Sequence, residues 1–128
     1  MVIEKTIIIL LALFGIKHFI CDFVLQNGKM LKDKGTYGGI GGLSHAACHA
    51  IGTLIVLFIV LPWSINSHAV AVILAGLDGL IHYHIDWIKT NLNKSYTPAD
   101  REFWILLGAD QGLHYLTYIG IIAILVLL

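Results

Sequence analysis

The sequence predicts an all-α, polytopic membrane protein built as an antiparallel bundle of four transmembrane helices. Of its 128 residues, 58% are hydrophobic and only 12% are charged, whereas soluble domains carry about 45–50% apolar and about 25% charged residues. The mean hydropathy is +0.84, and the apolar residues form four segments long enough to cross a bilayer core. The connections between these segments are short, so consecutive helices should run antiparallel. We expect a single domain over residues 1–128.

The first expected helix spans about residues 4–26. A short charged start followed by IIILLALFGI is similar to a signal peptide, but no cleavage site with small residues follows it. The segment should therefore be retained as a transmembrane helix. Asn27 and Gly28 are typical of a helix end, and a polar, glycine-rich loop is expected from 28 to 42.

The second expected helix spans about residues 43–60, with Ser44 as the capping residue at its start. Pro62 should end this helix, because proline cannot continue a helix. Trp63 lies in the short, uncharged turn that follows and is suited to a membrane interface.

The third expected helix spans about residues 68–89 and the fourth about 101–128. A second polar loop, from 90 to 100, connects them and ends in the sequence TPAD. This sequence is typical of a helix start, because it combines a capping threonine with proline and an acidic residue.

The basic residues indicate the orientation of the bundle. In an antiparallel bundle, the loops at 28–42 and 90–100 emerge on the same side of the membrane. Lys5 is the basic residue expected on the opposite side. The two loops and their flanks carry Lys29, Lys32, Lys34, Lys89, Lys94 and Arg101. The positive-inside rule therefore predicts a protein of the cytoplasmic (inner) membrane with both loops in the cytoplasm and both termini outside.

Charge and cysteine usage exclude other classes of protein. The formal net charge is zero, so no electrostatic feature predicts a nucleic-acid partner, and the lipid bilayer is the expected environment. Cys21 and Cys48 lie in apolar segments without the spacing of a zinc ribbon or a disulfide scaffold. We expect both to be buried small side chains.

Each expected helix carries ionisable residues four positions apart. That spacing places both members of a pair on one helical face. In each helix the pair lies near the end expected in the cytoplasm, so all four pairs should meet at one depth. The pairs are His18 and Asp22, His45 and His49, His82 and Asp86, and Asp110 and His114.

Histidine and aspartate without cysteine form a metal-ligand set. Burying a charged residue in a bilayer costs roughly 2.5–3.5 kcal/mol, whereas interhelical hydrogen bonds contribute only about 0.6 kcal/mol, so holding helices together does not explain the cluster. The eight residues exceed the four ligands of a structural zinc ion and are enough for two divalent ions such as zinc, manganese or iron. We expect Asp86 and Asp110 to take part in catalysis and Lys89 to hold an anion. Gln26 and Gln111 are candidates for orienting the ligands.

Three further ionisable residues lie near the cluster in the sequence. Lys17 and Asp78 lie deeper in their segments, and we expect them to form an ion pair beneath the metal layer, because a lone charge there would be costly. His84 is off the helical face shared by His82 and Asp86 and should face another surface.

The motifs resemble those of a known family. The strings KHFICDFVLQ (17–26), HAACH (45–49), HIDWIK (84–89) and DQGLH (110–114) are similar to the pattern of the domain-of-unknown-function family 3307, which comprises small bacterial and phage membrane proteins. The resemblance implies the same eight ligands with Gln26, Lys89 and Gln111, and it implies His82 rather than His84 as the partner of Asp86. Lys17 and Asp78 are not part of the pattern, and the family brings no established activity.

Four functions follow from these patterns. The first is a membrane metalloenzyme that hydrolyses a phosphoester or acyl bond of a lipid-like, amphipathic or phosphate-containing substrate near the cytoplasmic interface. The second is a metal ion or proton carrier, because chains of histidine and aspartate also line ion pathways. The third is a haem-binding bundle, and the fourth is a non-catalytic phage membrane accessory protein. The sequence does not indicate an oligomeric state.

Overall fold

The computed structural model describes residues 2–62 and 64–127, so the predictions for Trp63 and for the helix end at Leu128 lie outside the described residues. The described residues form helices and turns without a strand, which confirms the all-α prediction. The elements in chain order are α1 (Val2–Phe19), η1 (Ile20–Val24), α2 (Gly28–Asp33), α3 (Ile40–Val60), α4 (Ile65–Leu92), η2 (Asn93–Ser95) and α5 (Arg101–Leu127).

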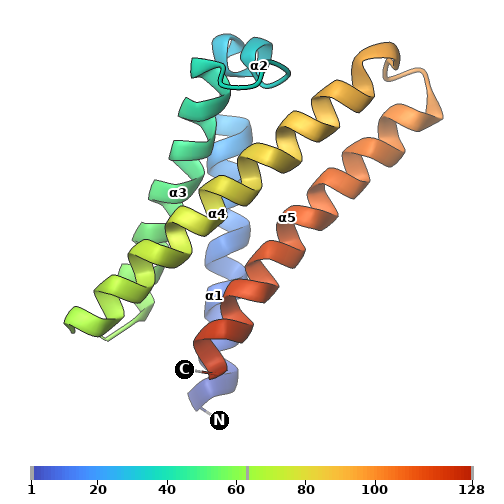
Figure 1. The fold of residues 1–128 in the computed structure, drawn as a ribbon. Coiled ribbons are helices and arrows are strands. Elements are labelled where there is room, and N and C mark those ends of the chain that lie inside the picture. The colour runs from blue at the N-terminus through green and yellow to red at the C-terminus, as the bar shows by residue number, and fades with distance from the viewer. Residues whose placement is uncertain (1, 63, 128) are drawn as a thin grey trace.

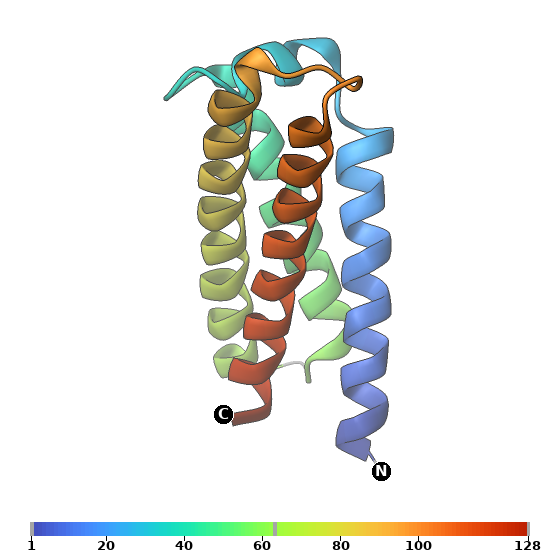
Figure 2. The ribbon, with the colours of Figure 1, turned by 90° about the vertical axis from the view of Figure 1, so that its right-hand side faces the viewer.

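The four long helices form an antiparallel bundle, as predicted (Figures 1 and 2). Four helical segments of the described chain are long and apolar enough to cross a membrane: Ile3–Val24, Ile40–Val60, Ile65–Ser95 and Arg101–Leu127. Helix α2 and the connection from α4 to α5 lie at one end of the bundle, which we call the loop end. Both termini and the connection from α3 to α4 lie at the other end (Figure 1).

The first connection contains more structure than the predicted loop. Helix α1 continues as the π-helical turn η1 and ends at Val24, two residues before the predicted end. Asn27 then begins the short helix α2, because its side chain accepts hydrogen bonds from the backbone N–H groups of Lys29 and Met30. The predicted stop at Asn27 is therefore also a helix start.

Helix α3 begins at Ile40, three residues before the predicted start, and its N-cap is Gly39. The prediction that Ser44 caps this helix is wrong, because its hydroxyl lies within the second turn and donates to the Ile40 carbonyl oxygen at 2.7 Å. The chain approaches α2 closely at this point. A Cβ at Gly41 would lie 2.5 Å from the carbonyl oxygen of Lys29, so only glycine allows this contact.

Helix α4 is longer than predicted at both ends. It begins at Ile65, after Ser64 accepts a hydrogen bond from the backbone N–H of Ser67 at 3.1 Å. It continues through Leu92 into η2. Helix α5 begins at Arg101 as predicted, and Thr97 donates to the Asp100 carboxylate through its N–H and hydroxyl groups, which lower the pKa of Asp100.

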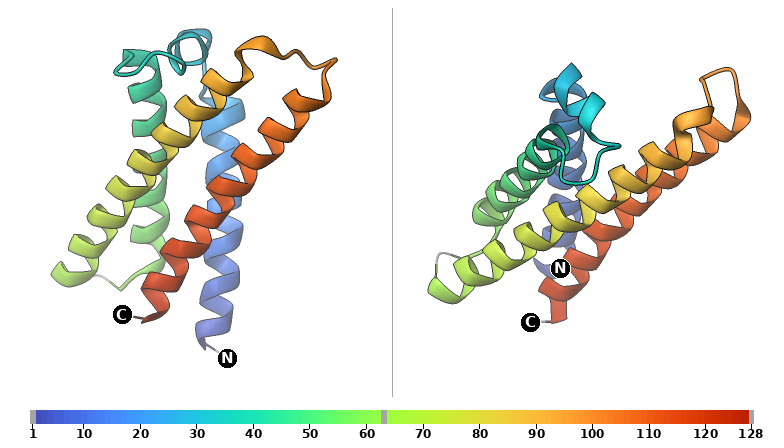
Figure 3. Two further views of the ribbon diagram at one scale, coloured as in Figure 1. Left: turned by 45° about the vertical axis from the view of Figure 1, so that its right-hand side comes forward. Right: turned by 45° about the horizontal axis from the view of Figure 1, so that its top comes forward.

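The half of the bundle away from the loop end has an apolar core. Phe14 and Tyr118 stack there with ring centroids 4.9 Å apart. Helices α3 and α4 pack closely beside this core, and the absence of a side chain at Gly79 allows it. A Cβ at Gly79 would lie only 2.9 Å from the Cβ of Ala50. The core comprises Leu10, Phe14, Val56, Leu57, Ala71, Leu74, Tyr118, Ile121 and Ile122. Toward the loop end, by contrast, α5 diverges from α1 (Figures 1 and 3).

Candidate metal centre

The eight histidine and aspartate residues meet in one layer between the apolar core and the loop end. Seven of them are buried and Asp22 is partly exposed. The seven buried residues are His18, His45, His49, His82, Asp86, Asp110 and His114. The structure therefore brings together the residues that the four-residue spacing singled out, and each helix contributes one pair.

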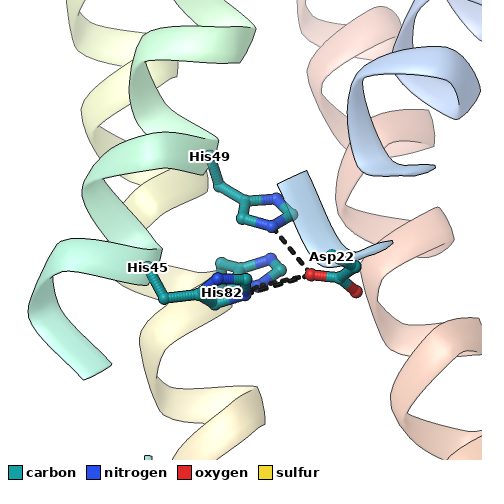
Figure 4. A group of neighbouring side chains, drawn as sticks. All are labelled: Asp22, His45, His49 and His82. Atoms are coloured by element: carbon teal, nitrogen blue, oxygen red, sulfur yellow. Dashed lines mark hydrogen bonds and ion pairs between the residues drawn. The ribbon is translucent and has the colours of Figure 1, made fainter. Parts of the chain in front are cut away.

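Four of these residues converge on one point (Figure 4). The Oδ1 atom of Asp22 lies 3.0 Å from Nε2 of both His45 and His49, and 4.0 Å from Nε2 of His82. The Nε2 atoms of His45 and His82 are 3.2 Å apart. In a tetrahedral zinc site with bonds of about 2.0–2.1 Å, neighbouring ligand atoms are separated by roughly 3.3 Å. The four donor atoms thus have the spacing of a metal site and could hold an ion.

A second group shares His82 with the first. Its members, His82, Asp86 and His114, could also hold an ion. The Asp86 carboxylate lies 3.3 Å from Nε2 of His82 and 3.8 Å from Nε2 of His114. Asp110 adds a carboxylate oxygen 3.5 Å from the same nitrogen of His114. Within the described chain, Oδ1 of Asp110 and Nε2 of His114 are buried and have no hydrogen-bond partner, as expected for unused ligand atoms.

The π-helical turn η1 carries Asp22. The N–H of Leu25 donates to the carbonyl oxygen of Ile20 at 2.9 Å, five residues earlier, so this turn is wider than an α-helical one. Asp22 sits inside the turn, with one carboxylate oxygen 3.1 Å from His18 and the other facing the α3 histidines. Sequence reasoning predicted a regular helix here, and π-turns have no simple sequence signature.

His18 lies outside both groups, although it was predicted as a ligand. Its Nε2 is 3.1 Å from Oδ2 of Asp22 and 3.1 Å from Oε1 of Gln111. Its Nδ1 is 2.9 Å from the hydroxyl of Tyr118. Gln111 in turn donates to Asp110 at 3.1 Å. His18 and Gln111 thus connect the carboxylates of Asp22 and Asp110.

Gln26, the other predicted orienting residue, contacts backbone instead. Its amide donates to the carbonyl oxygen of Asp22 at 3.0 Å. This bond stabilises the turn that carries Asp22. It does not involve the carboxylate of Asp22, which contacts the histidines.

Lys17 and Asp78 form the expected ion pair, with Nζ 2.7 Å from Oδ2. Thr53 donates to the same carboxylate oxygen at 2.6 Å. The ammonium group also lies 3.2 Å from the hydroxyl of Tyr118 and 3.1 Å from Nδ1 of His49. Sequence reasoning missed this last contact, which connects the deeper ion pair to the candidate metal centre.

The remaining histidines and the cysteines lie outside the cluster. His84 contacts the carbonyl oxygen of Leu80 and the hydroxyl of Tyr37, so it faces another surface, as predicted. Cys21 is a buried free thiol, as expected, whereas Cys48 is a free thiol that is only partly buried, so the expectation that both are buried is wrong for Cys48.

A cavity of about 440 Å³ opens beside the second group at the loop end. Its lining includes the three aspartates Asp22, Asp86 and Asp110, and the lysines Lys34, Lys89 and Lys94. The ammonium group of Lys34 lies 2.8 Å from Oδ2 of Asp86. Sequence reasoning selected Lys89 for this rim but treated Lys34 and Lys94 only as markers of orientation. Their contacts arise from the positions of α2 and η2, which no spacing rule indicates.

These features define a class of protein: a helical bundle with four segments able to cross a membrane and a buried histidine and aspartate cluster that could hold metal ions. A family model for "Protein of unknown function (DUF3307)" matches residues 9–128. The chain therefore belongs to this family, as its motifs suggested. No curated protein and no solved structure matches the chain.

Proposed function

We propose that this protein is an integral inner-membrane metalloenzyme that hydrolyses a phosphoester or lipid-like substrate near the cytoplasmic interface. In this proposal a first divalent ion is held by Asp22, His45, His49 and His82. A second is held by Asp86, Asp110 and His114, and His18 positions the ligand Asp22 through its contact of 3.1 Å with Oδ2. The ions would be zinc, manganese or iron, which imidazole and carboxylate ligands suit.

The observation that carries this proposal is the convergence of Asp22 with three imidazole nitrogens. The Oδ1 atom of Asp22 lies 3.0 Å from Nε2 of His45 and of His49 and 4.0 Å from that of His82, and the Nε2 atoms of His45 and His82 are 3.2 Å apart. Three of these separations are close to the edges of a tetrahedral ligand set, and the fourth is longer. The three histidines are at most 1% exposed. Such a concentration of polar groups in an apolar bundle is costly unless a cation compensates it.

The position of the second group supports hydrolysis over structural binding. Asp86 and Asp110 line the cavity, so a substrate can reach that side of the layer. Divalent ions lower the pKa of bound water and polarise phosphoryl oxygens. A carboxylate of the cavity lining that does not bind the ion would accept the proton of the attacking water, and Lys89, which also lines the cavity, would attract an anionic group.

The orientation follows from the basic residues at the loop end. Lys34, Lys89 and Lys94 surround the cavity mouth, and the positive-inside rule assigns such an end to the cytoplasm. The substrate would therefore be reached from the cytoplasmic leaflet or the cytoplasm.

The alternative functions have less support. A carrier needs a polar route across the bilayer, whereas below the Lys17 and Asp78 layer the described core is apolar. A haem needs a flat slot between its axial ligands, whereas the rings of His49 and His82 stack with centroids 3.4 Å apart. A phage accessory role gives the cluster no purpose.

Metal analysis of the purified protein tests the proposal. We expect one or two divalent ions per chain by mass spectrometric elemental analysis, and loss of metal in Asp22→Asn. His84→Ala is the matched control, because it removes an imidazole outside the cluster and should keep the metal. Phosphodiester hydrolysis should disappear with a chelator and return with the metal. A folded, metal-free protein with undiminished hydrolysis would refute the proposal.

A further inference from the structure

The cavity at the loop end is lined by acidic, basic and apolar side chains. Asp22, Asp86 and Asp110 form its polar side, next to the candidate metal centre. The lining also contains the ammonium groups of Lys34, Lys89 and Lys94, and its apolar part, which we call the apolar side, includes Phe23, Leu31 and Leu107. A cavity that combines charged and apolar walls suits an amphipathic ligand.

The apolar side is continuous with the outer surface of the bundle. Phe23 lines the cavity and is 69% exposed, and it stacks on Phe19, another exposed residue of the same helical face. Across from it, α5 diverges from α1 toward the loop end (Figure 3). The cavity is thus lined by Phe23 on η1 and Leu107 on α5, and its apolar side reaches the exposed surface of the bundle at Phe23.

The net charge around the cavity becomes positive when a metal ion binds. Three aspartates and three lysines line it, so without a metal their charges cancel. Lys34 then occupies the place of a cation, 2.8 Å from Asp86. A divalent ion bound to Asp86 would repel this ammonium group and leave an excess of two positive charges per ion. The loaded cavity is thus complementary to an anion.

From these three observations we propose that the substrate is an anionic membrane lipid, with a phosphate head group that carries no compensating positive charge. The phosphate binds between the metal layer and the ammonium groups of Lys34 and Lys89, with Lys94 at the rim. The acyl chains leave between η1 and α5, past Phe23 and Leu107, into the cytoplasmic leaflet. Metal binding to Asp86 releases Lys34, which then pairs with the phosphate. This inference rests on the proposed metal centre and identifies its substrate class.

Native mass spectrometry of the metal-loaded protein in detergent tests the inference without measuring activity. The probes are short-chain phosphatidic acid, the matching phosphatidylcholine and inorganic phosphate. We expect phosphatidic acid to bind at least about tenfold more tightly than phosphatidylcholine, and Lys89→Gln to remove most of this difference. Lys32→Gln is the control, because Lys32 is an exposed lysine of α2 at the same end of the bundle and is not among the residues that line the cavity.

A second pair of variants tests whether the acyl chains leave the cavity between η1 and α5. Leu107→Trp fills the apolar side and should weaken phosphatidic acid binding about tenfold, while inorganic phosphate binding stays unchanged. Leu106→Trp is its control, because Leu106 lines a different hollow beside Tyr96 and Glu102. Each variant is compared with the wild-type protein at equal metal content.

The outcomes separate this inference from the proposed function. Elemental analysis of the same samples is the first reading, and a protein that binds no divalent ion refutes the metal centre. A metal-loaded protein that binds both lipids equally refutes the phosphate lipid site alone. If inorganic phosphate binds as tightly as phosphatidic acid and Leu107→Trp changes neither, the ligand is a soluble phosphate and the lipid proposal is wrong.

Discussion

The buried pair of Lys17 and Asp78 allows a quantitative test of how this bundle balances charge. Lys17 is 5% exposed and Asp78 is 1% exposed, so either charge alone would be stranded in an apolar interior. Removing one partner of a buried pair costs about 3–5 kcal/mol. Lys17→Met keeps the length of the side chain but leaves the Asp78 carboxylate with Thr53 as its donor. We expect this variant to lose about 4–5 kcal/mol of unfolding free energy.

The loss in Asp78→Asn should be smaller, about 3 kcal/mol, because Lys17 keeps its contacts with Tyr118 and His49. In the double variant no charge is left unpaired, and the remaining loss should be about 1–2 kcal/mol, the cost of imperfectly paired polar groups. The double variant is therefore expected to be more stable than Lys17→Met alone.

The measurement is reversible unfolding in mixed detergent micelles, followed by far-ultraviolet circular dichroism. Lys5→Met is the matched control, because it makes the same replacement at an exposed position of the same helix and should change the free energy by no more than about 0.5 kcal/mol. If the losses of the two single variants simply add in the double variant, the two residues act independently and the reasoning is refuted.

Three other predictions concern the metal centre and the loop end. A divalent metal at about 100 times its dissociation constant should raise the unfolding free energy by about 2.7 kcal/mol. Asp22→Asn should abolish this increase. An equal increase in that variant would contradict the assigned ligands. Gly41→Ala should destabilise the protein by about 1–3 kcal/mol, because its Cβ would lie 2.5 Å from a backbone oxygen. Gly76→Ala is the control in the same unfolding assay and should be neutral or stabilising, because a Cβ at Gly76 meets no atom within 4 Å. Asn27→Ala should cost about 0.5–2 kcal/mol and speed amide hydrogen exchange in α2; unchanged exchange there would show that the cap is dispensable.

Much of the fold could be predicted from local properties of the chain. Apolar segments longer than a bilayer is thick form helices, because backbone polar groups must be satisfied within the segment. Their lengths were predicted to within a few residues. The additional helix α2 was missed, because its six residues, Gly28–Asp33, are too few for a periodic pattern, and only the geometry of Asn27 marks its start.

The candidate site could be predicted as a set of residues but not as an arrangement. The spacing of His45 and His49, or of Asp110 and His114, identifies a helical face without saying which faces meet. The same spacing treats His18 like the other histidines, yet in the structure it bonds to Gln111 and Tyr118.

The sequence by itself determined that this chain is a bundle of apolar helices with ionisable side chains at one depth. It also predicted that Lys17 pairs with Asp78, because a single buried charge is costly in an apolar bundle, and the structure contains this pair. Only the tertiary structure decided which atoms of the cluster meet. Asp22 faces His45 and His49 because η1 widens its turn, and Lys34 reaches Asp86 because α2 packs against the start of α3. Hydrophobicity and spacing act along one helix, whereas distances between side chains on different helices depend on how those helices cross and rotate against one another.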